Sequence, residues 1–505
     1  LFFADEDEYD LNEIFGTKNK KYKVRGLIEI LSSYKFTITE NTPIEEEIAL
    51  DPELLGKVFE NLLASYNPET RTTARKQTGS YYTPREIVNY MVDESLIAYL
   101  KTKLTEQPLS YQPLGSLQTN FLGNDYKAGQ LEMQVELAYN KWKEKEEELD
   151  LRLHELFSYE NEENPFIDDK ESSDAIISHL SECKILDPAC GSGAFPMGIL
   201  HKIVLALGKL DPCNYSWKQA QLDKAVRDRH RAEEFEDEAL KNDAIKRAEE
   251  KIRYIEESFG DTGHELDYAR KLFLIENCIY GVDIQQVAVQ ISKLRFFISL
   301  MVDQKVNDKK RNRNILSLPN LETKFVAANT LIPIEKPQQL LLKDPEVEKF
   351  EKTLQEIHHK IFYTRGYGEK KKLKKEELDT RKHLRKLYVE RAGYQKEAAE
   401  AITKWNPFDP LKAAPFFDPE VMYAIDNKGE ESCFDILIGN PPYGLLNKKQ
   451  NKAESINVSE SDHSFYLNSH YYSHAVGGMV NIFRLFILRS FYLLNEKGIF
   501  SEIFP

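Results

Sequence analysis

Four short apolar runs, each ending in a polar or turn-forming residue, stand out in the hydrophobic pattern of the chain. Runs of this length that are bounded by turn signals are typical of buried strands. The pattern therefore predicts strands over Lys184–Asp187, Cys278–Asp283, Lys324–Ala327 and Phe434–Ile438.

Two of these predicted strands are followed by apolar residues at helical spacing. The first set is Met197, Leu200, Ile203, Val204 and Leu207, and the second is Val287, Ile291, Leu294 and Ile298. A strand, a glycine-containing turn and a helix form the opening unit of a doubly wound nucleotide-binding sheet. The sequence therefore predicts an α/β fold with a Rossmann-like, doubly wound sheet.

Charged helical stretches interrupt this pattern. We expect insertions at about 105–178, 210–270 and 335–425 within a domain that covers 76–505. Residues 1–75 are predicted to form a helical connector, with an amphipathic helix that begins after Asp51-Pro52. The basic clusters Lys370–Lys375 and Arg381–Lys386 lie in the third insertion and are interpreted as a solvated helix face.

The turn after the first predicted strand reads Asp187-Pro188-Ala189-Cys190-Gly191-Ser192-Gly193. Gly191 and Gly193 allow the backbone to approach a ligand closely. The third glycine of the dinucleotide fingerprint is missing, which argues against a pyrophosphate and is compatible with S-adenosylmethionine. The following helix N-terminus would favour the methionine carboxylate, and Asp187 can pair with the ammonium group. A purely structural turn is the alternative.

Two further segments fit the same ligand. Asp283 ends the second predicted strand, where such folds bind ribose hydroxyls, although it can also be a helix N-cap. In Thr78–Glu86, Thr83 is predicted to cap a helix with Pro84 at its first position and Glu86 completing a capping box. The preceding hydroxyl-rich and aromatic loop is suited to the methionine end of the cofactor.

Asn440-Pro441-Pro442-Tyr443 directly follows the predicted strand Phe434–Ile438 and its glycine. The Asn440 side-chain oxygen and the Pro441 carbonyl are hydrogen-bond acceptors, and the proline rings hold φ in place. Tyr443 offers an aromatic face for stacking. The tetrapeptide favours a site for a flat base with an exocyclic amino group, with an ordinary Asn-Pro turn as the alternative.

These four segments, in this order, resemble DNA N6-adenine methyltransferases of the γ motif order. Thr78–Pro84, Asp187–Gly193, Gly281–Asp283 and Asn440–Tyr443 are similar to the motifs numbered X, I, II and IV. Asn329 resembles the third motif, and Asn481–Phe486 and Gly498–Pro505 resemble the helix and fifth strand beyond the catalytic loop. The similarity spans roughly 50–505 and is closest to the methyltransferase part of single-chain type IIG restriction–modification enzymes and to type I modification subunits.

The resemblance implies methyl transfer from S-adenosylmethionine, without a metal, to the amino group of an adenine flipped out of double-stranded DNA. It gives the catalytic role to Asn440, Pro441, Pro442 and Tyr443. It implies cofactor binding by Thr78, Gly79, Tyr81, Tyr82, Thr83, Asp187, Pro188, Ala189, Gly191, Gly193, Phe195, Asp283, Ile284 and Asn329. A nuclease domain and a target-recognition domain are expected in the parent polypeptide, outside this chain.

Two other classes of protein remain open. Protein-glutamine and ribosomal-RNA methyltransferases share an Asn-Pro-Pro-Tyr motif and the cofactor, and a non-catalytic DNA-binding subunit would keep the fold. The Thr78–Pro84 element and the large insertions favour DNA adenine as the substrate.

Composition adds three expectations. The net charge of −15 restricts DNA contact to local basic clusters, of which Lys448–Lys452 in the polar loop Asn447–Ser464 is the best candidate. Five cysteines without a C-x-x-C pair predict reduced thiols and no zinc site. No segment is long and apolar enough to span a membrane. The resemblance implies a cytoplasmic enzyme of a bacterium or archaeon.

Overall fold

The structure is a computed structural model. It describes residues 83–105, 145–233, 266–304, 318–335, 344–364, 367–423, 433–446, 458–475 and 480–504, with a few isolated positions between them. The chain divides into two compact units, 1–55 and 56–505, and every described residue belongs to the second. The predicted helix after Asp51-Pro52 and the segment Thr78–Tyr82 lie outside the described residues.

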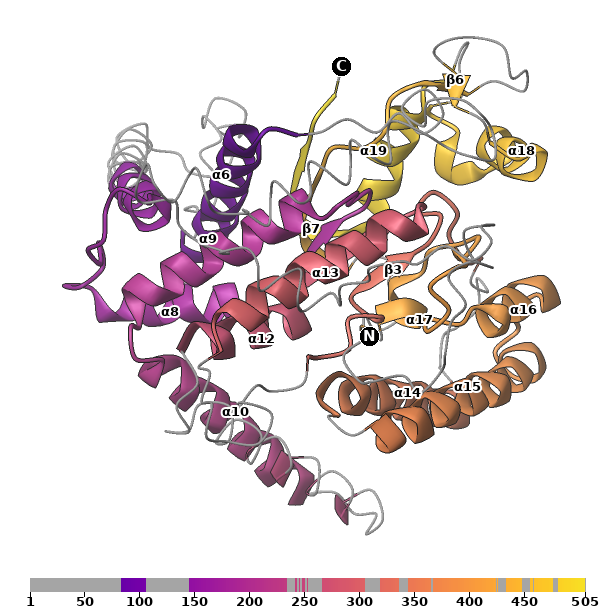
Figure 1. Ribbon diagram of the computed structural model, residues 1–505, viewed down its shortest axis with the longest axis horizontal. Helices are drawn as coiled ribbons and strands as arrows, with labels where there is room; N and C mark the ends of the chain where they lie inside the picture. The colour runs from indigo at the N-terminus through magenta and orange to yellow at the C-terminus, as the bar shows by residue number, and fades with distance from the viewer. Residues whose placement is uncertain are drawn as a thin grey trace, which may run out of the picture. The chain divides into compact units, whose positions relative to one another are not determined.

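A parallel sheet organises the described residues (Figure 1). Its strands follow the order β3-β2-β1-β4-β7 and all neighbours are parallel. Their bounds are β1 Ile185–Asp187, β2 Ile279–Asp283, β3 Phe325–Ala327, β4 Phe434–Gly439 and β7 Leu494–Glu502. The chain runs outward from β1 to β3 and then returns to place β4 on the other side of β1. Sheets of this order bind ligands at the carboxyl ends of the strands, where the order reverses.

The four strands predicted from the apolar runs are all present, with bounds that differ by one residue at most. The strand predicted at Gly498–Pro505 begins earlier, because Leu494 already pairs with Phe434. The helix predicted at Asn481–Phe486 is α19 (Ile482–Leu493), capped by the Asn481 side chain. The fold is therefore mixed α/β around a parallel sheet, as expected.

Alternate residues of the strands enter two separate hydrophobic clusters. Ile185 of β1 and Ile436 of β4 belong to one cluster, whereas Leu186 and Leu437 belong to the other. Because successive side chains of a strand point to opposite faces, the two clusters lie on the two faces of the sheet. The first cluster includes residues of α6 (Arg85–Leu104), α8 (Lys170–Glu182), α9 (Ala194–Leu210), α12 (Leu266–Asn277) and α13 (Gln286–Val302). The second includes residues of α14 (Pro345–Tyr363), α15 (Tyr367–Glu390), α16 (Lys396–Lys404) and α17 (Pro419–Tyr423).

The described parts of the predicted insertions contain helices joined by loops, with α10 (Tyr215–Glu233) in the second and α14 and α15 side by side in the third (Figure 1). The interpretation of Arg381–Lys386 as a wholly solvated face is wrong for Arg381, which is 1% exposed. Its guanidinium donates to Glu377 at 2.5 Å and lies over the Trp405 ring. The ion pair lies within α15, and the Arg381 guanidinium connects that helix to Trp405, which directly follows α16.

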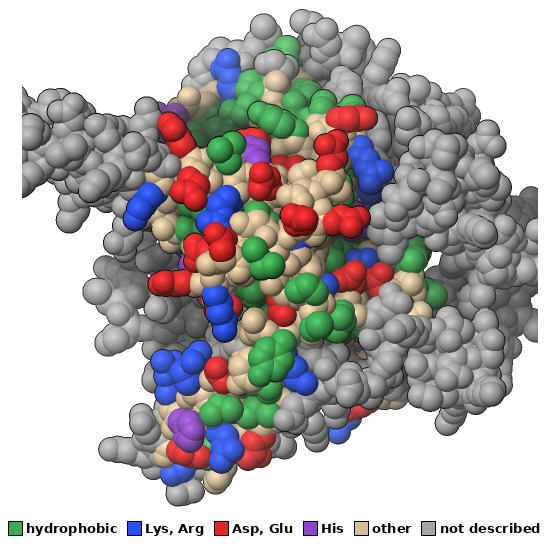
Figure 2. All heavy atoms as spheres, turned by 90° about the vertical axis from the view of Figure 1, so that its left-hand side faces the viewer, with side chains coloured by type: hydrophobic (Ala, Val, Ile, Leu, Met, Phe, Trp, Pro, Cys, Tyr) green, Lys and Arg blue, Asp and Glu red, His purple; other side chains and the backbone are tan. Residues whose placement is uncertain are grey.

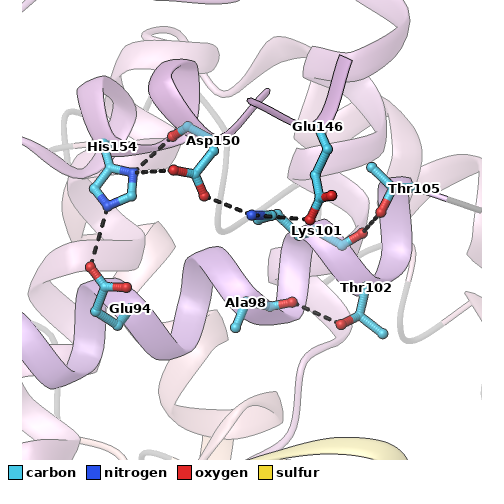
Figure 3. Close-up of polar contacts among 8 residues, drawn as sticks. All are labelled: Glu94, Ala98, Lys101, Thr102, Thr105, Glu146, Asp150 and His154. Atoms are coloured by element: carbon cyan, nitrogen blue, oxygen red, sulfur yellow. Dashed lines mark hydrogen bonds and ion pairs between the residues drawn. The ribbon is translucent and has the colours of Figure 1, made fainter. Parts of the chain in front are cut away.

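Helix α6 is anchored to the helix over residues 145–157 by a group of charged side chains (Figure 3). Lys101 Nζ lies 2.8 Å from Asp150 Oδ1 and 3.3 Å from Glu146 Oε1. His154 Nε2 lies 3.3 Å from Glu94 Oε1. Such partly exposed pairs stabilise the fold only weakly, so their main effect is on the orientation of the two helices. That orientation matters because Thr83 lies two residues before α6.

The face of the molecule in Figure 2 carries acidic and basic side chains interspersed with apolar ones. In that view the described residues form no continuous basic surface of the kind that DNA backbone binding requires.

Among the described helices, none has the length and apolar character needed to cross a membrane. The five cysteines form no disulfide, in agreement with the predicted reduced thiols.

Candidate active site

The loop after β4 lies against the turn after β1. Gly439 ends β4, and a Cβ atom built on it would lie 2.7 Å from Asp187 Oδ1 and 3.4 Å from the Pro188 ring. Only a residue without a side chain fits at this contact. Asn440 is therefore held next to the glycine turn, and the two motifs that dominate the sequence pattern meet at one edge of the sheet.

Both polar atoms of the Asn440 amide make hydrogen bonds within the protein. Its Nδ2 donates to Thr83 Oγ1 at 3.0 Å, and its Oδ1 accepts from the Tyr443 hydroxyl. The same hydroxyl lies 2.9 Å from the Ile503 carbonyl oxygen. A hydroxyl has one proton, so Tyr443 can donate to only one of these two acceptors at a time.

The predicted capping role of Thr83 is wrong. Helix α6 begins at Arg85, its N-cap position is Pro84, and no side chain caps it. Thr83 is 7% exposed and its hydroxyl is directed to Asn440 instead. The hydroxyl thus links the segment before α6 to the loop after β4.

The turn after β1 is held by backbone and side-chain contacts from neighbouring strands. Cys190 N donates to Val282 O at 2.8 Å, and Thr330 Oγ1 donates to Pro188 O at 2.7 Å. Gly193 has φ +84°, and a Cβ there would lie 2.9 Å from Ser292 Oγ. Gly193 is therefore required because the turn packs closely against α13.

Asp283 connects the end of β2 to the same turn. Its Oδ2 accepts from Gly191 N at 2.9 Å and its Oδ1 from Gln285 N at 2.7 Å. The N-cap position of α13 is Gln285, so the alternative reading of Asp283 as the cap does not hold. The Ile284 side chain beside it is 58% exposed.

Asn329 follows β3 and is 7% exposed. Its Nδ2 donates to the Tyr466 hydroxyl at 3.1 Å, and its Oδ1 accepts from Leu331 N at 3.1 Å. Phe195 is buried in the first turn of α9 and packs in the hydrophobic core. Tyr466 is a neighbour that the sequence pattern did not single out.

Two carboxyl groups at this edge have raised pKa values. Burial raises the pKa of Asp187 well above its ordinary value, and the nearby acidic groups of Asp283 and Glu502 act in the same direction when ionised. The Ala189 backbone N–H, which donates to Asp187 Oδ1 at 3.1 Å, opposes this. The other oxygen of Asp187 accepts no hydrogen bond from the described residues. It is suited to a cationic group.

Glu502 was missed by sequence reasoning, because nothing in its neighbourhood along the chain marks it. It ends β7 and pairs in register with Gly439. Burial raises its pKa to about 8, and the Ser490 hydroxyl donates to its Oε1 at 3.1 Å. Its Oε2 is buried without a partner in the described part of the chain. Burial thus favours the protonated form of the Glu502 carboxyl.

The raised pKa of Glu502 predicts a pH-dependent stability. Between pH 4.5 and about 8 the folded state retains a proton that the unfolded state loses, so the stability of the fold falls as the pH rises through this window. Glu502→Gln removes this contribution. The free energy of unfolding of the variant minus that of the unaltered protein should therefore increase from pH 5 to pH 8.5. Chemical denaturation at a series of pH values measures it. Glu496→Gln, at an exposed position of the same strand, is the control; identical pH slopes for all three proteins would contradict the prediction.

The structure brings together the described members of the predicted site: Thr83, Asp187, Pro188, Ala189, Gly191, Gly193, Asp283, Asn329 and Asn440–Tyr443 follow or adjoin the carboxyl ends of β1, β2, β3 and β4. Thr78, Gly79, Tyr81 and Tyr82 lie outside the described residues, as does the basic cluster Lys448–Lys452. The polar loop expected over Asn447–Ser464 is shorter than predicted. Helix α18 (Glu460–Asn468) begins within it, because Ser459 caps the helix and Tyr466 is buried.

Comparison with known proteins shows which proteins this chain is similar to. The family model described as "Eco57I restriction-modification methylase" matches residues 277–505, which include Asp283, Asn329 and the Asn440 loop. A protein of Methanocaldococcus jannaschii, named as a "putative type II restriction enzyme and methyltransferase", is 24% identical over 490 residues. This chain resembles restriction–modification methyltransferases.

The similarity to restriction–modification methyltransferases has defined limits. The alignment with the Methanocaldococcus jannaschii protein covers 86% of this chain and 33% of that protein. The chain thus spans about a third of the length of the curated relative that it matches.

Proposed function

We propose that this chain transfers a methyl group from S-adenosylmethionine to the exocyclic amino group of adenine in double-stranded DNA, as part of a restriction–modification system. The observation that carries the proposal is the contact between the loop of Asn440 and the turn after β1, made through Gly439 and Asp187. A hydrogen-bonding amide next to the glycine turn of a parallel sheet suits group transfer between a base and a bound cofactor.

The residues at this edge have the chemistry that the cofactor needs. The Asp187 oxygen that accepts no hydrogen bond from the described residues would pair with its ammonium group, which would favour the ionised carboxylate. Asp283 is suited to the ribose hydroxyls, and the exposed Ile284 side chain to the flat face of the cofactor adenine. We regard the sheet as doubly wound, with the cofactor at the carboxyl ends of β1 and β4, between which the strand order reverses. When bound, the cofactor supplies an electrophilic methyl group on a sulfonium.

Asn440 has the central role in this proposal. The amino group of adenine is a poor nucleophile because its lone pair is delocalised into the ring. Hydrogen bonds from that amine to Asn440 Oδ1 and the Pro441 carbonyl would favour a tetrahedral, nucleophilic nitrogen. The Tyr443 hydroxyl occupies Asn440 Oδ1 in this structure. On substrate binding its proton would turn to the Ile503 carbonyl, which leaves the Asn440 oxygen for the amine.

The amine of a paired adenine is inaccessible in duplex DNA, so the base must be flipped out, and the Tyr443 ring would stack on it. Lys448–Lys452, a few residues beyond Tyr443, are proposed to contact the backbone. A nuclease domain and a target-recognition domain in the parent polypeptide are further proposed partners.

A transfer assay with tritiated S-adenosylmethionine tests the proposal on duplex DNA, ribosomal RNA and protein in parallel. We expect label only in DNA, recovered as N6-methyladenine after digestion to nucleosides. Label confined to RNA or to protein glutamine would contradict the proposed substrate. Cofactor binding without any transfer by the full-length parent would instead identify a non-catalytic subunit.

A further inference from the structure

A cavity lies at the amino ends of the strands, opposite the candidate active site. Its volume is about 310 Å³. Lys184, Asn277 and Lys324 precede β1, β2 and β3 respectively, and all three line it, so the cavity opens at the amino ends of these strands. His358 of α14 closes another side. Nothing in the proposed methyl transfer uses this cavity.

Lys324 is the unusual group in this cavity. Its side chain is 8% exposed, and its Nζ lies 4.6 Å from the centre of the Tyr280 ring. No described residue accepts a hydrogen bond from this ammonium or forms an ion pair with it. A buried ammonium without an acceptor is costly, and an aromatic face compensates for only a part of the lost hydration. The position therefore favours an anion in the cavity.

The charged residues that line the cavity are positive on balance, and the Glu276 carboxylate offsets a part of the Lys324 charge. Lys184 adds a second cation on the cavity wall, and Glu276 is the acidic residue that lines it. Burial lowers the pKa of His358, so this ring adds no positive charge at neutral pH. Burial also lowers the pKa of Lys324, to about 8, which leaves its ammonium mostly charged at pH 7. Asn277 and Thr323 are further polar residues on the wall.

We propose that this cavity binds a small free anion, a phosphate or a carboxylate, with the Lys324 ammonium as its charged partner. The recessed position of Lys324 excludes the bulky backbone of duplex DNA as the source of the phosphate. The site is separate from the carboxyl ends of the strands. The anion would therefore be a second ligand of this protein and would not contact the ligands proposed for the candidate active site. The inference does not depend on the proposed methyl transfer.

Isothermal titration calorimetry of the whole chain at pH 7, in Tris buffer of low ionic strength, tests the proposal with inorganic phosphate and with acetate. We expect one of these anions to bind at one site per chain. Lys324→Met should weaken its affinity by about tenfold or more, because a charge-assisted hydrogen bond is lost. Lys324→Arg should restore part of it. Lys184→Met, at a more accessible position, should weaken binding less.

Lys404→Met is the matched control, because Lys404 lies on α16 as an exposed lysine outside the cavity. Without anion, Lys324→Met should unfold at the same or a higher denaturant concentration than the unaltered protein, since it removes a buried charge to which no described residue is hydrogen-bonded. The proposal fails if neither phosphate nor acetate binds. It also fails if the anion that binds has the same affinity for the Lys324→Met variant as for the Lys404→Met variant. Displacement of bound phosphate by non-cognate duplex DNA would also overturn it, by assigning the cavity to the DNA surface.

Discussion

Replacement of Asn440 by alanine is expected to lower the rate of methyl transfer to adenine by about three orders of magnitude, the loss typical of a preorganised hydrogen-bonding group at a reacting centre. The change removes the acceptor proposed for the amine. It leaves the turn after β1 in place, because Gly439 rather than Asn440 makes the contact with Asp187. The affinity for S-adenosylmethionine should therefore stay nearly constant. Single-turnover transfer and calorimetry with the cofactor measure the two effects separately.

Tyr443→Phe is the matched comparison for Asn440→Ala. It removes the hydroxyl that bonds Asn440 Oδ1 and Ile503 O but keeps the ring proposed to stack on the base. We expect a much smaller loss in rate than for Asn440→Ala, because the amide acceptor stays. Normal turnover of Asn440→Ala would refute the role given to this side chain. An equal loss of cofactor affinity in Asn440→Ala would indicate a collapsed site rather than a lost acceptor.

Asp283→Ala is expected to weaken the binding of S-adenosylmethionine by about 10- to 100-fold, the value of one or two hydrogen bonds to a charged group. Two causes act together. The proposed contact with the ribose is lost, and Gly191 N loses the acceptor that fixes the turn beside it. Calorimetric titration of the cofactor against the variant provides the dissociation constant.

Asp435→Ala is the control for Asp283→Ala, because it tests whether a general loss of stability is enough to weaken cofactor binding. Asp435 also accepts a backbone hydrogen bond from a neighbouring segment, from Lys184 N at 2.9 Å, but at the amino end of the sheet. We expect both alanine variants to be destabilised, with weakened cofactor binding only in Asp283→Ala. A dissociation constant for Asp283→Ala that matches that of Asp435→Ala would remove Asp283 from the proposed site.

Much of this arrangement could be predicted, because strands, turns and helix starts depend on neighbouring residues. Asp187, Asp283, Asn329 and Asn440 each follow an apolar run that forms a parallel strand, so their positions at one edge of the sheet follow from the strand pattern. Thr83 shows where such reasoning stops. Its local pattern with Pro84 and Glu86 predicts a cap, but the hydroxyl bonds to Asn440, which lies 357 positions away in the chain.

The amino-acid sequence by itself determined the order of the elements and the chemical groups that end each strand, since apolar spacing and the backbone restrictions of glycine and proline act over a few residues. Only the tertiary structure decided which of those groups meet and in what state of charge. The contact of the Tyr443 hydroxyl with both Asn440 and Ile503, the raised pKa of Glu502 and the burial of the Lys324 ammonium are of this second kind. Each depends on burial and on distances between segments far apart in the chain, and no local pattern encodes either quantity.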